Sequence, residues 1–240
     1  MKKNLKDLIN ILKELRAPDG CEWDREQTHE SLIPYLLEET YEVIEAIEQK
    51  DYVLLKEELG DLLLHVVFQA ELASEKNNFN IYDSISNIIE KLINRHPHIF
   101  SDKKDQSYAK GSWELAKKKE KKRNSILDGV PKAMPALTKA SRIQEKASGV
   151  GFDWDNLSQV YDKVYEELDE LKEAIKSKKE NEIKDEFGDV LFSMVNLSRH
   201  ISINPEVALD KSIIKFKDRF QTLEKYLDKN KLEIKNQSLS

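Results

Sequence analysis

The chain has 240 residues, 39% of them hydrophobic and 35% charged, with a formal net charge of −6. This length suffices for one or two compact cores, whereas the negative charge argues against a nucleic-acid polymer as partner, since its phosphates need a broad basic surface. The only cysteine, Cys21, excludes an intramolecular disulfide and a C-x-x-C site, and no segment reaches the roughly 20 apolar residues of a membrane span. We therefore expect a cytoplasmic protein that has no membrane partner.

Apolar residues recur at helical spacing along the chain, and seven glycines and six prolines are few for this length. The pattern predicts an all-α fold. In the first half, a loop at 17–24 separates the first two of four expected helices: one from Leu5 to Arg16, one with Glu39 and Glu42, one with Glu58 and Asp61 that ends near Lys76, and one from about Ile81 to Arg95.

The second half repeats this plan after a connector marked by Gly129, Pro131 and Pro135. We expect a helix from Ala136 to Ala147, a loop at 149–155, a helix with Glu167 and Glu170, a helix with Glu186 and Asp189, and a last helix from Pro205 to Leu227. The chain is thus predicted to form two tandem helical domains, residues 1–122 and 137–240, joined by a linker at 123–136.

An acidic pattern occurs in both halves at a constant offset of 128 residues. Each copy consists of two carboxylate pairs, and the two residues of a pair are three positions apart, which places them on one face of a helix. Two such pairs on facing helices make an all-oxygen site suited to a hard cation such as Mg2+. The candidate ligands are Glu39, Glu42, Glu58 and Asp61 in the first copy, and Glu167, Glu170, Glu186 and Asp189 in the second.

These acids have two alternative interpretations. They could form a solvated acidic face, but the helix with Glu58 and Asp61 is apolar around most of its circumference, so we expect it to be largely buried. A di-iron bundle would need histidine three residues after glutamate. Instead, His65 follows Asp61 by four residues and Ser193 takes its place in the second copy, which favours His65 as a neighbour of the site.

Basic and aromatic residues near each copy could bind a phosphorylated ligand. Lys91 and Arg95, like Lys215 and Arg219, place two cations on one helical face, where they serve either solubility or phosphate binding. Trp113 could stack on a base, with the Lys117 ammonium on a phosphate, and the second half has no counterpart of this pair. With no P-loop in the sequence, metal-assisted hydrolysis of a phosphoanhydride is the simplest hypothesis.

Several motifs together resemble the MazG family of nucleoside triphosphate pyrophosphohydrolases in its two-domain bacterial form. They run from Gly20 to His29, Tyr35 to Ile47, Glu57 to Leu63, Arg95 to Phe100, Val150 to Trp154 and Asp185 to Asp189. The resemblance implies a helical homodimer that uses Mg2+, with Mn2+ as an alternative and more than one ion per site, to split nucleoside triphosphates into a monophosphate and pyrophosphate. It also implies a role in nucleotide housecleaning and in stress responses.

The resemblance assigns roles to individual residues. The eight carboxylates become metal ligands, and Glu38 and Glu166 become the groups that orient or deprotonate the water. Lys163, Lys215 and Arg219 would hold phosphates in the second domain, as Lys91 and Arg95 would in the first.

Two departures from the family pattern stand out: Glu22 replaces a proline, and a C-terminal Trp-x-x-x-Lys segment is missing. The second departure supports an alternative from another class, a helical regulatory protein that has lost catalysis and binds a partner. An enzyme restricted to deoxynucleotides or to one modified base is a further alternative.

Overall fold

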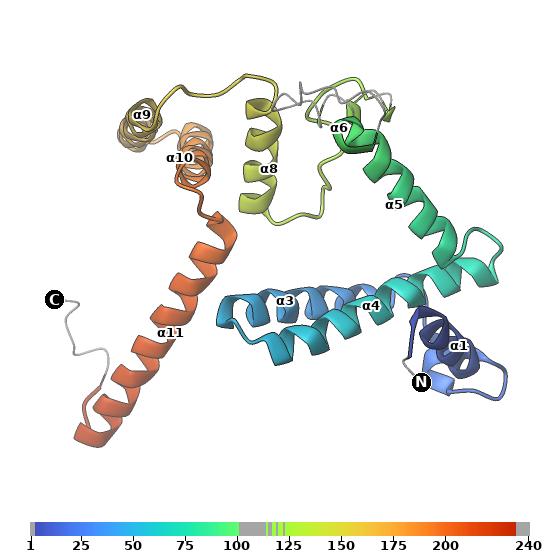
Figure 1. The fold of residues 1–240 in the computed structure, drawn as a ribbon. Coiled ribbons are helices and arrows are strands. Elements are labelled where there is room, and N and C mark those ends of the chain that lie inside the picture. The colour runs from blue at the N-terminus through green and yellow to red at the C-terminus, as the bar shows by residue number, and fades with distance from the viewer. Residues whose placement is uncertain (1–2, 101–113, 115–116, 119, 122, 234–240) are drawn as a thin grey trace. The chain divides into compact units, whose positions relative to one another are not determined.

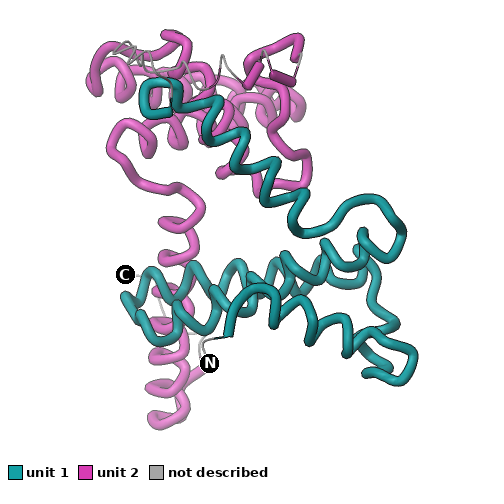
Figure 2. Tube along the Cα trace, turned by 45° about the vertical axis from the view of Figure 1, so that its right-hand side comes forward, with its two compact units in different colours: residues 1–104 teal, residues 105–240 magenta. Residues whose placement is uncertain are grey.

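A computed structural model describes residues 3–100, 114, 117–118, 120–121 and 123–233 (Figure 1). Every regular element in these residues is a helix, so the prediction of an all-α fold is confirmed. No helix in this part of the chain is long and apolar enough to cross a membrane. Contacts divide the chain into two compact units, residues 1–104 and 105–240, shown in different colours in Figure 2.

The first unit is organised around an antiparallel pair of helices. Its helices are α1 (Leu5–Arg16), α2 (Glu22–Glu26), α3 (Ile33–Gln49), α4 (Tyr52–Glu75), α5 (Ile81–Arg95) and α6 (Pro97–Phe100). Helices α3 and α4 pack side by side, joined by a tight turn in which Lys50 has a φ of 57°. The Asp51 side chain accepts hydrogen bonds from the first-turn amides of α4, which fixes where that helix begins.

The core of this unit lies between α1 and the second half of α4. Ile9 and Leu12 of α1 pack there against Val67 and Phe68 of α4. Arg16 closes the end of this layer: its guanidinium donates to Glu75 at 2.5 and 2.7 Å and lies over the Phe68 ring. The first half of α4, which carries the carboxylates, packs against α3.

The second unit repeats the antiparallel pair. Its described helices are α8 (Ala136–Ser148), α9 (Leu157–Ser177), α10 (Glu180–His200) and α11 (Pro205–Asn230). The turn between α9 and α10 is made by Lys178, whose φ is 59° and which lies 128 residues after Lys50. On the other side of α10, Gln144 of α8 donates to the Phe192 carbonyl oxygen at 2.8 Å. The register of the repeat therefore extends to the turn that sets the two carboxylate helices beside each other.

Helix α11 is attached to the rest of the second unit near its own N-terminus. Glu206 in its first turn accepts hydrogen bonds from the Thr138 amide at 3.1 Å and the Thr138 hydroxyl at 3.0 Å, and so caps α8. From there α11 leads away from α9 and α10 (Figures 1 and 2). Most of its length is exposed, including apolar residues such as Ile213 and Phe216.

The division between the compact units falls earlier than the boundary suggested by the sequence. Glu114 is buried in the second unit, where it accepts from Lys146 of α8 at 2.8 Å and also from Arg142. The expected linker at 123–136 therefore lies within the second compact unit. We still propose that the two repeated domains extend over residues 1–122 and 137–240.

The expectation that the carboxylate helix of the first unit is largely buried is met in the second half of α4, where Val67, Phe68 and Leu72 are buried, but not along one stripe beside the carboxylates. We call this surface the α4 stripe. It consists of Leu59, Leu63 and Val66, whose exposed fractions are 50%, 44% and 47%. Helices α3 and α1 cover other parts of the α4 surface, which leaves this stripe open. The equivalent surface of α10 consists of Phe187, Leu191 and Met194, which we call the α10 stripe, and it is equally exposed.

Candidate metal centres

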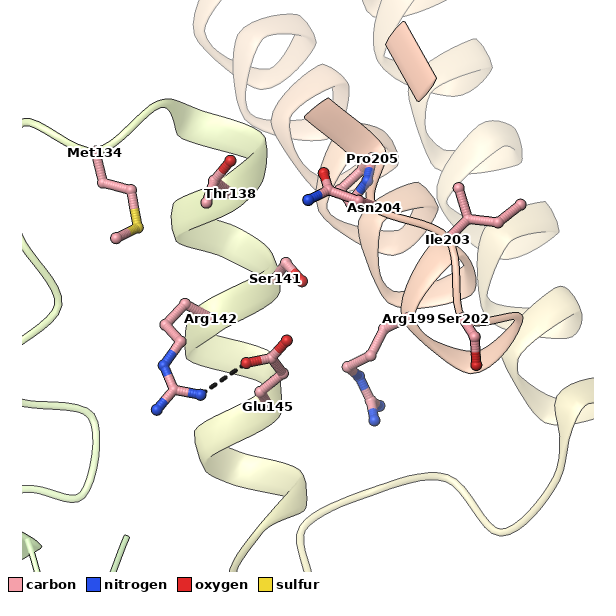
Figure 3. Close-up of a pocket in the computed structure, with 10 residues that line it drawn as sticks. All are labelled: Met134, Thr138, Ser141, Arg142, Glu145, Arg199, Ser202, Ile203, Asn204 and Pro205. Carbon is pink, nitrogen blue, oxygen red and sulfur yellow. Dashed lines mark hydrogen bonds and ion pairs between the residues drawn. The ribbon is translucent and has the colours of Figure 1, made fainter. Parts of the chain in front are cut away.

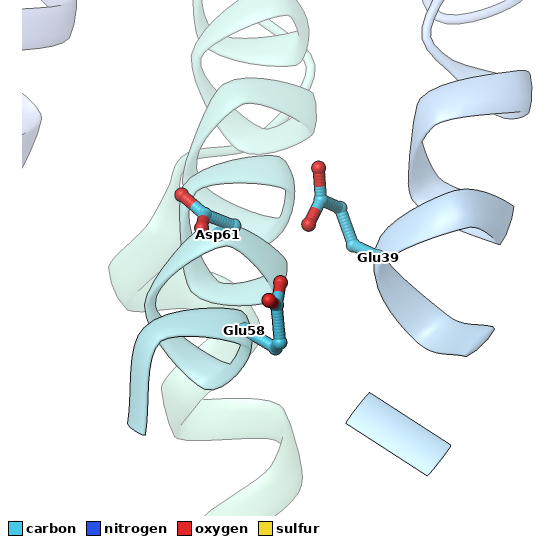
Figure 4. Close-up of side chains that lie close together, drawn as sticks. All are labelled: Glu39, Glu58 and Asp61. Atoms are coloured by element: carbon cyan, nitrogen blue, oxygen red, sulfur yellow. The ribbon is translucent and has the colours of Figure 1, made fainter. Parts of the chain in front are cut away.

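The α3–α4 pair brings three carboxylates together. Glu39 of α3 faces Glu58 and Asp61 of α4 across the gap between the two helices (Figure 4). One carboxylate oxygen from each lies within 4.8 Å of those of the other two, a spacing that allows a single cation to contact all three. We call these residues the first cage. Glu58 is only 9% exposed, although its helix shows apolar residues to solvent nearby.

The electrostatics of the first cage reflect crowded negative charge. Desolvation, followed by repulsion from Asp61 and Glu42, raises the pKa of Glu39 to about 6. The pKa of Glu58 is also raised, again mainly by desolvation and then by Glu42 and Asp61. These carboxylates repel one another when ionised, and a bound cation would remove that repulsion.

The fourth predicted ligand of the first copy, Glu42, is outside the group of converging oxygens. Its charge nevertheless contributes to the raised pKa of both Glu39 and Glu58, so its carboxylate is close to the cage. The structure thus brings together three of the four predicted ligands and places the fourth beside them.

The α9–α10 pair forms a second cage from Glu167, Glu170 and Glu186, again with one oxygen from each within 4.8 Å of the others. Glu167 is 7% exposed and Glu170 is exposed. Asp189 is outside this group, but its charge helps to raise the pKa of Glu186, after desolvation and the charge of Glu170. The cage opens into an acidic groove of about 600 Å³ between α9 and α10.

Lys163 lies directly on the second cage. Its ammonium is 2.8 Å from a carboxylate oxygen of Glu167 and 2.8 Å from one of Glu166, respectively four and three residues further along α9. These contacts raise the pKa of Lys163, through the hydrogen bond to Glu166 first and then the one to Glu167. Glu166 itself points toward solvent, with 56% of its side chain exposed.

The first cage has an aromatic group where the second has this lysine. Tyr35 precedes Lys163 by 128 residues and lies one helical turn before Glu39. Its ring is nearly parallel to that of His65, with centroids 6.4 Å apart, and meets the Trp23 ring edge-on at 5.8 Å. Sequence reasoning missed Tyr35, although its position in the repeat was a sufficient signal.

His65 is a buried neighbour of the first cage. It is 8% exposed, burial lowers its pKa, and its Nδ1 has no hydrogen-bond partner among the described residues. The oxygens of the first cage converge without it.

Four predicted phosphate-binding cations are not brought to the cage of their own unit. Lys91 and Arg95 belong to α5, which leads away from the end of α4, and Lys215 and Arg219 are exposed on α11 (Figure 1). Glu38, the predicted catalytic residue of the first copy, is exposed on α3. Lys117 lies 3.6 Å from Glu114, and Trp113 is outside the described residues.

The residues of both cages fit a hard divalent cation. All converging groups are carboxylates, each set combines one largely buried acid with more accessible ones, and both sets lie on paired helices. Oxygen ligands of this kind suit Mg2+ or Mn2+ better than softer metals. Such a site could bind a metal-associated phosphate, provided that cations from elsewhere compensate the remaining charge.

A separate cavity of about 330 Å³ lies between α8 and the turn that joins α10 to α11 (Figure 3). Its two guanidinium groups already have carboxylate partners: Arg142 donates to Glu145 at 2.7 Å, and Arg199 donates to Asp153 at 2.9 Å. These pairs neutralise the basic lining, and the cavity is not lined by any residue of the second cage. It is therefore a weaker candidate than the cages.

The chain matches the family model described as the MazG nucleotide pyrophosphohydrolase domain, over residues 27–100 and 156–224. These two segments contain the two cages. A curated relative from Thermotoga maritima, the nucleoside triphosphate pyrophosphohydrolase/pyrophosphatase MazG, is 51% identical over 226 residues, covering 94% of this chain and 88% of that protein.

Two further relatives extend this similarity. A nucleoside triphosphate pyrophosphohydrolase of Escherichia coli K12 is 43% identical over 237 residues, which cover 95% of this chain and 89% of that protein. The uncharacterized protein YabN of Bacillus subtilis is 44% identical over 235 residues, covering 96% of this chain but 48% of that protein.

Proposed function

Because the chain belongs to the MazG nucleotide pyrophosphohydrolase family, we propose that it hydrolyses nucleoside triphosphates to a monophosphate and pyrophosphate with the help of Mg2+. The observation that carries this proposal is the convergence of three carboxylates on each helix pair, at the positions predicted from the repeat. We assign metal binding to the first and second cages, with Glu42 and Asp189 completing them.

The protein groups have distinct tasks in this proposal. When bound, a divalent ion would neutralise the phosphates and make the phosphorus more electrophilic. Glu166, which reaches solvent beside the second cage, orients the attacking water and accepts its proton at a carboxylate oxygen. Glu38 occupies the same position in the first copy. Lys163 is close enough to Glu167 to contact a phosphate bound at the cage.

We propose that the working form is a homodimer and that Lys215 and Arg219 act on the site of the partner chain. Within the second unit α11 leads away from the second cage, so these two cations can reach a phosphate tail at that cage only from another chain or after a large movement. The exposed α4 and α10 stripes provide apolar surfaces that a second copy can cover. Lys91 and Arg95 would act similarly at the first cage.

The cellular role that we propose is nucleotide housecleaning in the cytoplasm, with a contribution to stress responses. This part of the proposal rests on the family resemblance alone. The alternative function, a partner-binding protein without catalysis, is favoured by one observation: the long α11 exposes Ile213 and Phe216. The two convergent carboxylate sets favour the enzyme.

The proposed activity is tested by measuring release of monophosphate and pyrophosphate from a panel of nucleoside and deoxynucleoside triphosphates, with and without Mg2+. Glu58→Gln and Glu167→Gln each remove the most buried ligand of one cage. We expect at least one of them to lower turnover by about 100-fold or more, because one negative ligand is lost where charge must be balanced. Glu45→Gln and Glu173→Gln are matched controls on the same helices.

Wild-type protein that hydrolyses none of these nucleotides in Mg2+ or Mn2+ would contradict the proposal and support the partner-binding alternative. Unchanged turnover in both cage variants would leave an enzyme whose site is elsewhere. The panel also separates a broad housecleaning enzyme from one restricted to deoxynucleotides.

A further inference from the structure

The second cage already contains a cation of the protein itself. The Lys163 ammonium contacts Glu167, a member of the cage, and Glu166, the proposed base, at 2.8 Å each. The side chain of Glu167 is 9% exposed and that of Lys163 is 33% exposed, so water screens this pair less than a surface ion pair. A divalent ion that binds Glu167 must compete with this ammonium.

The first cage has a different residue at this position of the repeat. Tyr35 places an uncharged phenol ring one turn before Glu39, where the second unit places an ammonium one turn before Glu167. The crowded charge of the first cage is therefore relieved by protonation or by a bound cation, whereas the lysine already relieves part of the charge of the second. Two cages with the same ligand types consequently differ in their built-in counter-charge.

We propose that Lys163 is an intrinsic counter-cation of the second cage, which a divalent ion displaces from Glu167 and which then turns to a phosphate of the nucleotide. The first cage, with Tyr35 at this position, binds its ion without that competition and fills at a lower metal concentration. This inference rests on the proposed function, because it takes both cages to be metal sites and the ligand to be a nucleotide.

The flexible lysine suits such an exchange. Its ammonium is a compact charge on a four-carbon chain with three donors, so it can leave one oxygen and contact another a few ångströms away. Glu166 keeps the displaced ammonium beside the cage, since it binds the same nitrogen and is 56% exposed. Lys163 is thus a positioning residue that couples metal binding to phosphate binding.

The proposal predicts two effects of opposite sign for one substitution. Lys163→Met removes the competing cation, so metal should bind more tightly without nucleotide. The same change removes a phosphate contact, so nucleotide should bind more weakly once metal is saturating. If Lys163 only contacted phosphate, its removal would weaken nucleotide binding and leave the metal affinity without nucleotide unchanged.

The experiment uses the full chain with Glu58→Gln added, which disables the first cage, and measures Mn2+ binding by calorimetry without nucleotide. We expect Lys163→Met to tighten Mn2+ binding by about fivefold, the size of an ion pair that solvent partly reaches. Lys163→Arg keeps the charge and should keep the wild-type Mn2+ affinity. At saturating Mn2+, the affinity for a non-hydrolysable triphosphate analogue should fall by about tenfold in Lys163→Met.

Lys172→Met is the matched control, because it removes a lysine from the same helix that pairs with Asp169 at 2.7 Å but is 67% exposed. It should change neither affinity. The reverse exchange is made in a Glu167→Gln background, where Tyr35→Lys should weaken Mn2+ binding at the first cage. Circular dichroism confirms that each variant is folded before binding is compared.

Equal Mn2+ affinity in the parent and in Lys163→Met would overturn this inference and leave the proposed function intact. The same holds if Lys172→Met tightens binding as much as Lys163→Met, because the effect would then be one of net charge. Absence of Mn2+ binding to the wild-type chain would instead overturn the metal-dependent function itself.

Discussion

Glu39 shows at the scale of a residue how the metal-free cage is strained by charge. It lies on a helix edge where desolvation comes first and the charges of Asp61 and Glu42 add to it, and its pKa rises to about 6. The group binds its proton more tightly in the folded chain than in the unfolded one. This tighter proton binding stabilises the folded chain. Its contribution is complete below the unfolded pKa of 4.5 and is lost as the pH rises through the folded pKa of about 6.

We therefore predict that Glu39→Gln stabilises the metal-free chain at pH 7 and changes little at pH 4.5. The gain should be about 1 kcal/mol, because solvent screening reduces the effect of a shift of this size. Urea unfolding of wild type and variant at both pH values measures it, with Glu45→Gln as the control on the same helix. An equal effect of Glu39→Gln at the two pH values would contradict the assignment of this strain to Glu39.

His65 gives a second prediction at this scale. The ring is buried and its Nδ1 lacks a hydrogen-bond partner in the described structure, which costs free energy. His65→Phe keeps a flat ring beside Tyr35 and removes the unpaired nitrogen, so it should raise the free energy of unfolding by about 0.5–1 kcal/mol. His65→Ala should lower it by about 2 kcal/mol by leaving a cavity. Denaturant titration measures both changes. Equal destabilisation by His65→Phe and His65→Ala would show that the unpaired Nδ1 does not cost stability.

At the scale of the element, the two antiparallel helix pairs share a feature that a single chain does not require. Gly60 and Gly188 lie between the carboxylates of α4 and α10, in helix interiors where glycine is unfavourable. A Cβ atom added at either position would meet nothing within 4 Å. Close packing against the described residues of the chain therefore does not explain these two glycines.

Gly60→Ala should accordingly raise the free energy of unfolding of the metal-free monomer by about 0.5–1 kcal/mol, as expected for an open position inside a helix. Gly20→Ala is the contrasting variant, because its Cβ would clash with the Leu15 carbonyl oxygen and should destabilise the chain. Thermal unfolding of dilute protein compares the two. Destabilisation by Gly60→Ala would mean that another surface approaches α4 closely in solution.

At the scale of the whole molecule, the exposed apolar surface is the main unexplained cost of a solitary chain. The α4 and α10 stripes occupy the same register in the two repeats and lie on the helices that carry the cages. Surface of this kind is normally covered by another protein surface. In the proposed dimer, association and assembly of the site would involve the same helices.

The double variant Leu63→Glu, Leu191→Glu is therefore predicted to convert the proposed dimer into monomers, because it places a charge in the middle of each stripe. Analytical ultracentrifugation at micromolar concentration measures the change. Val53→Glu, which alters an exposed valine of α4 outside the stripe, should leave the assembly unchanged. A wild-type chain that is already monomeric at this concentration would contradict the proposed homodimer.

The helices, the repeat and the identity of the acids could be predicted from the amino-acid sequence, because each depends on local periodicity. A capping residue such as Asp51 marks where a helix begins. The two acids of each pair are three residues apart, which places them on one face of their helix. The family resemblance from the same residues was confirmed by the match to the family model.

Which oxygens converge and which surfaces stay open depends instead on the packing of the helices. Glu42 and Asp189 have the same spacing as their neighbours, yet the packing of each helix pair aims other side chains at the centre. The exposure of Leu63 likewise follows from how the helices pack against each other, whereas the contact of Lys163 with Glu167 lies within α9 and needs only the i, i+4 spacing of one helix. Periodicity specifies the face of a helix, whereas the direction of each side chain across an interface depends on helix crossing and rotamers.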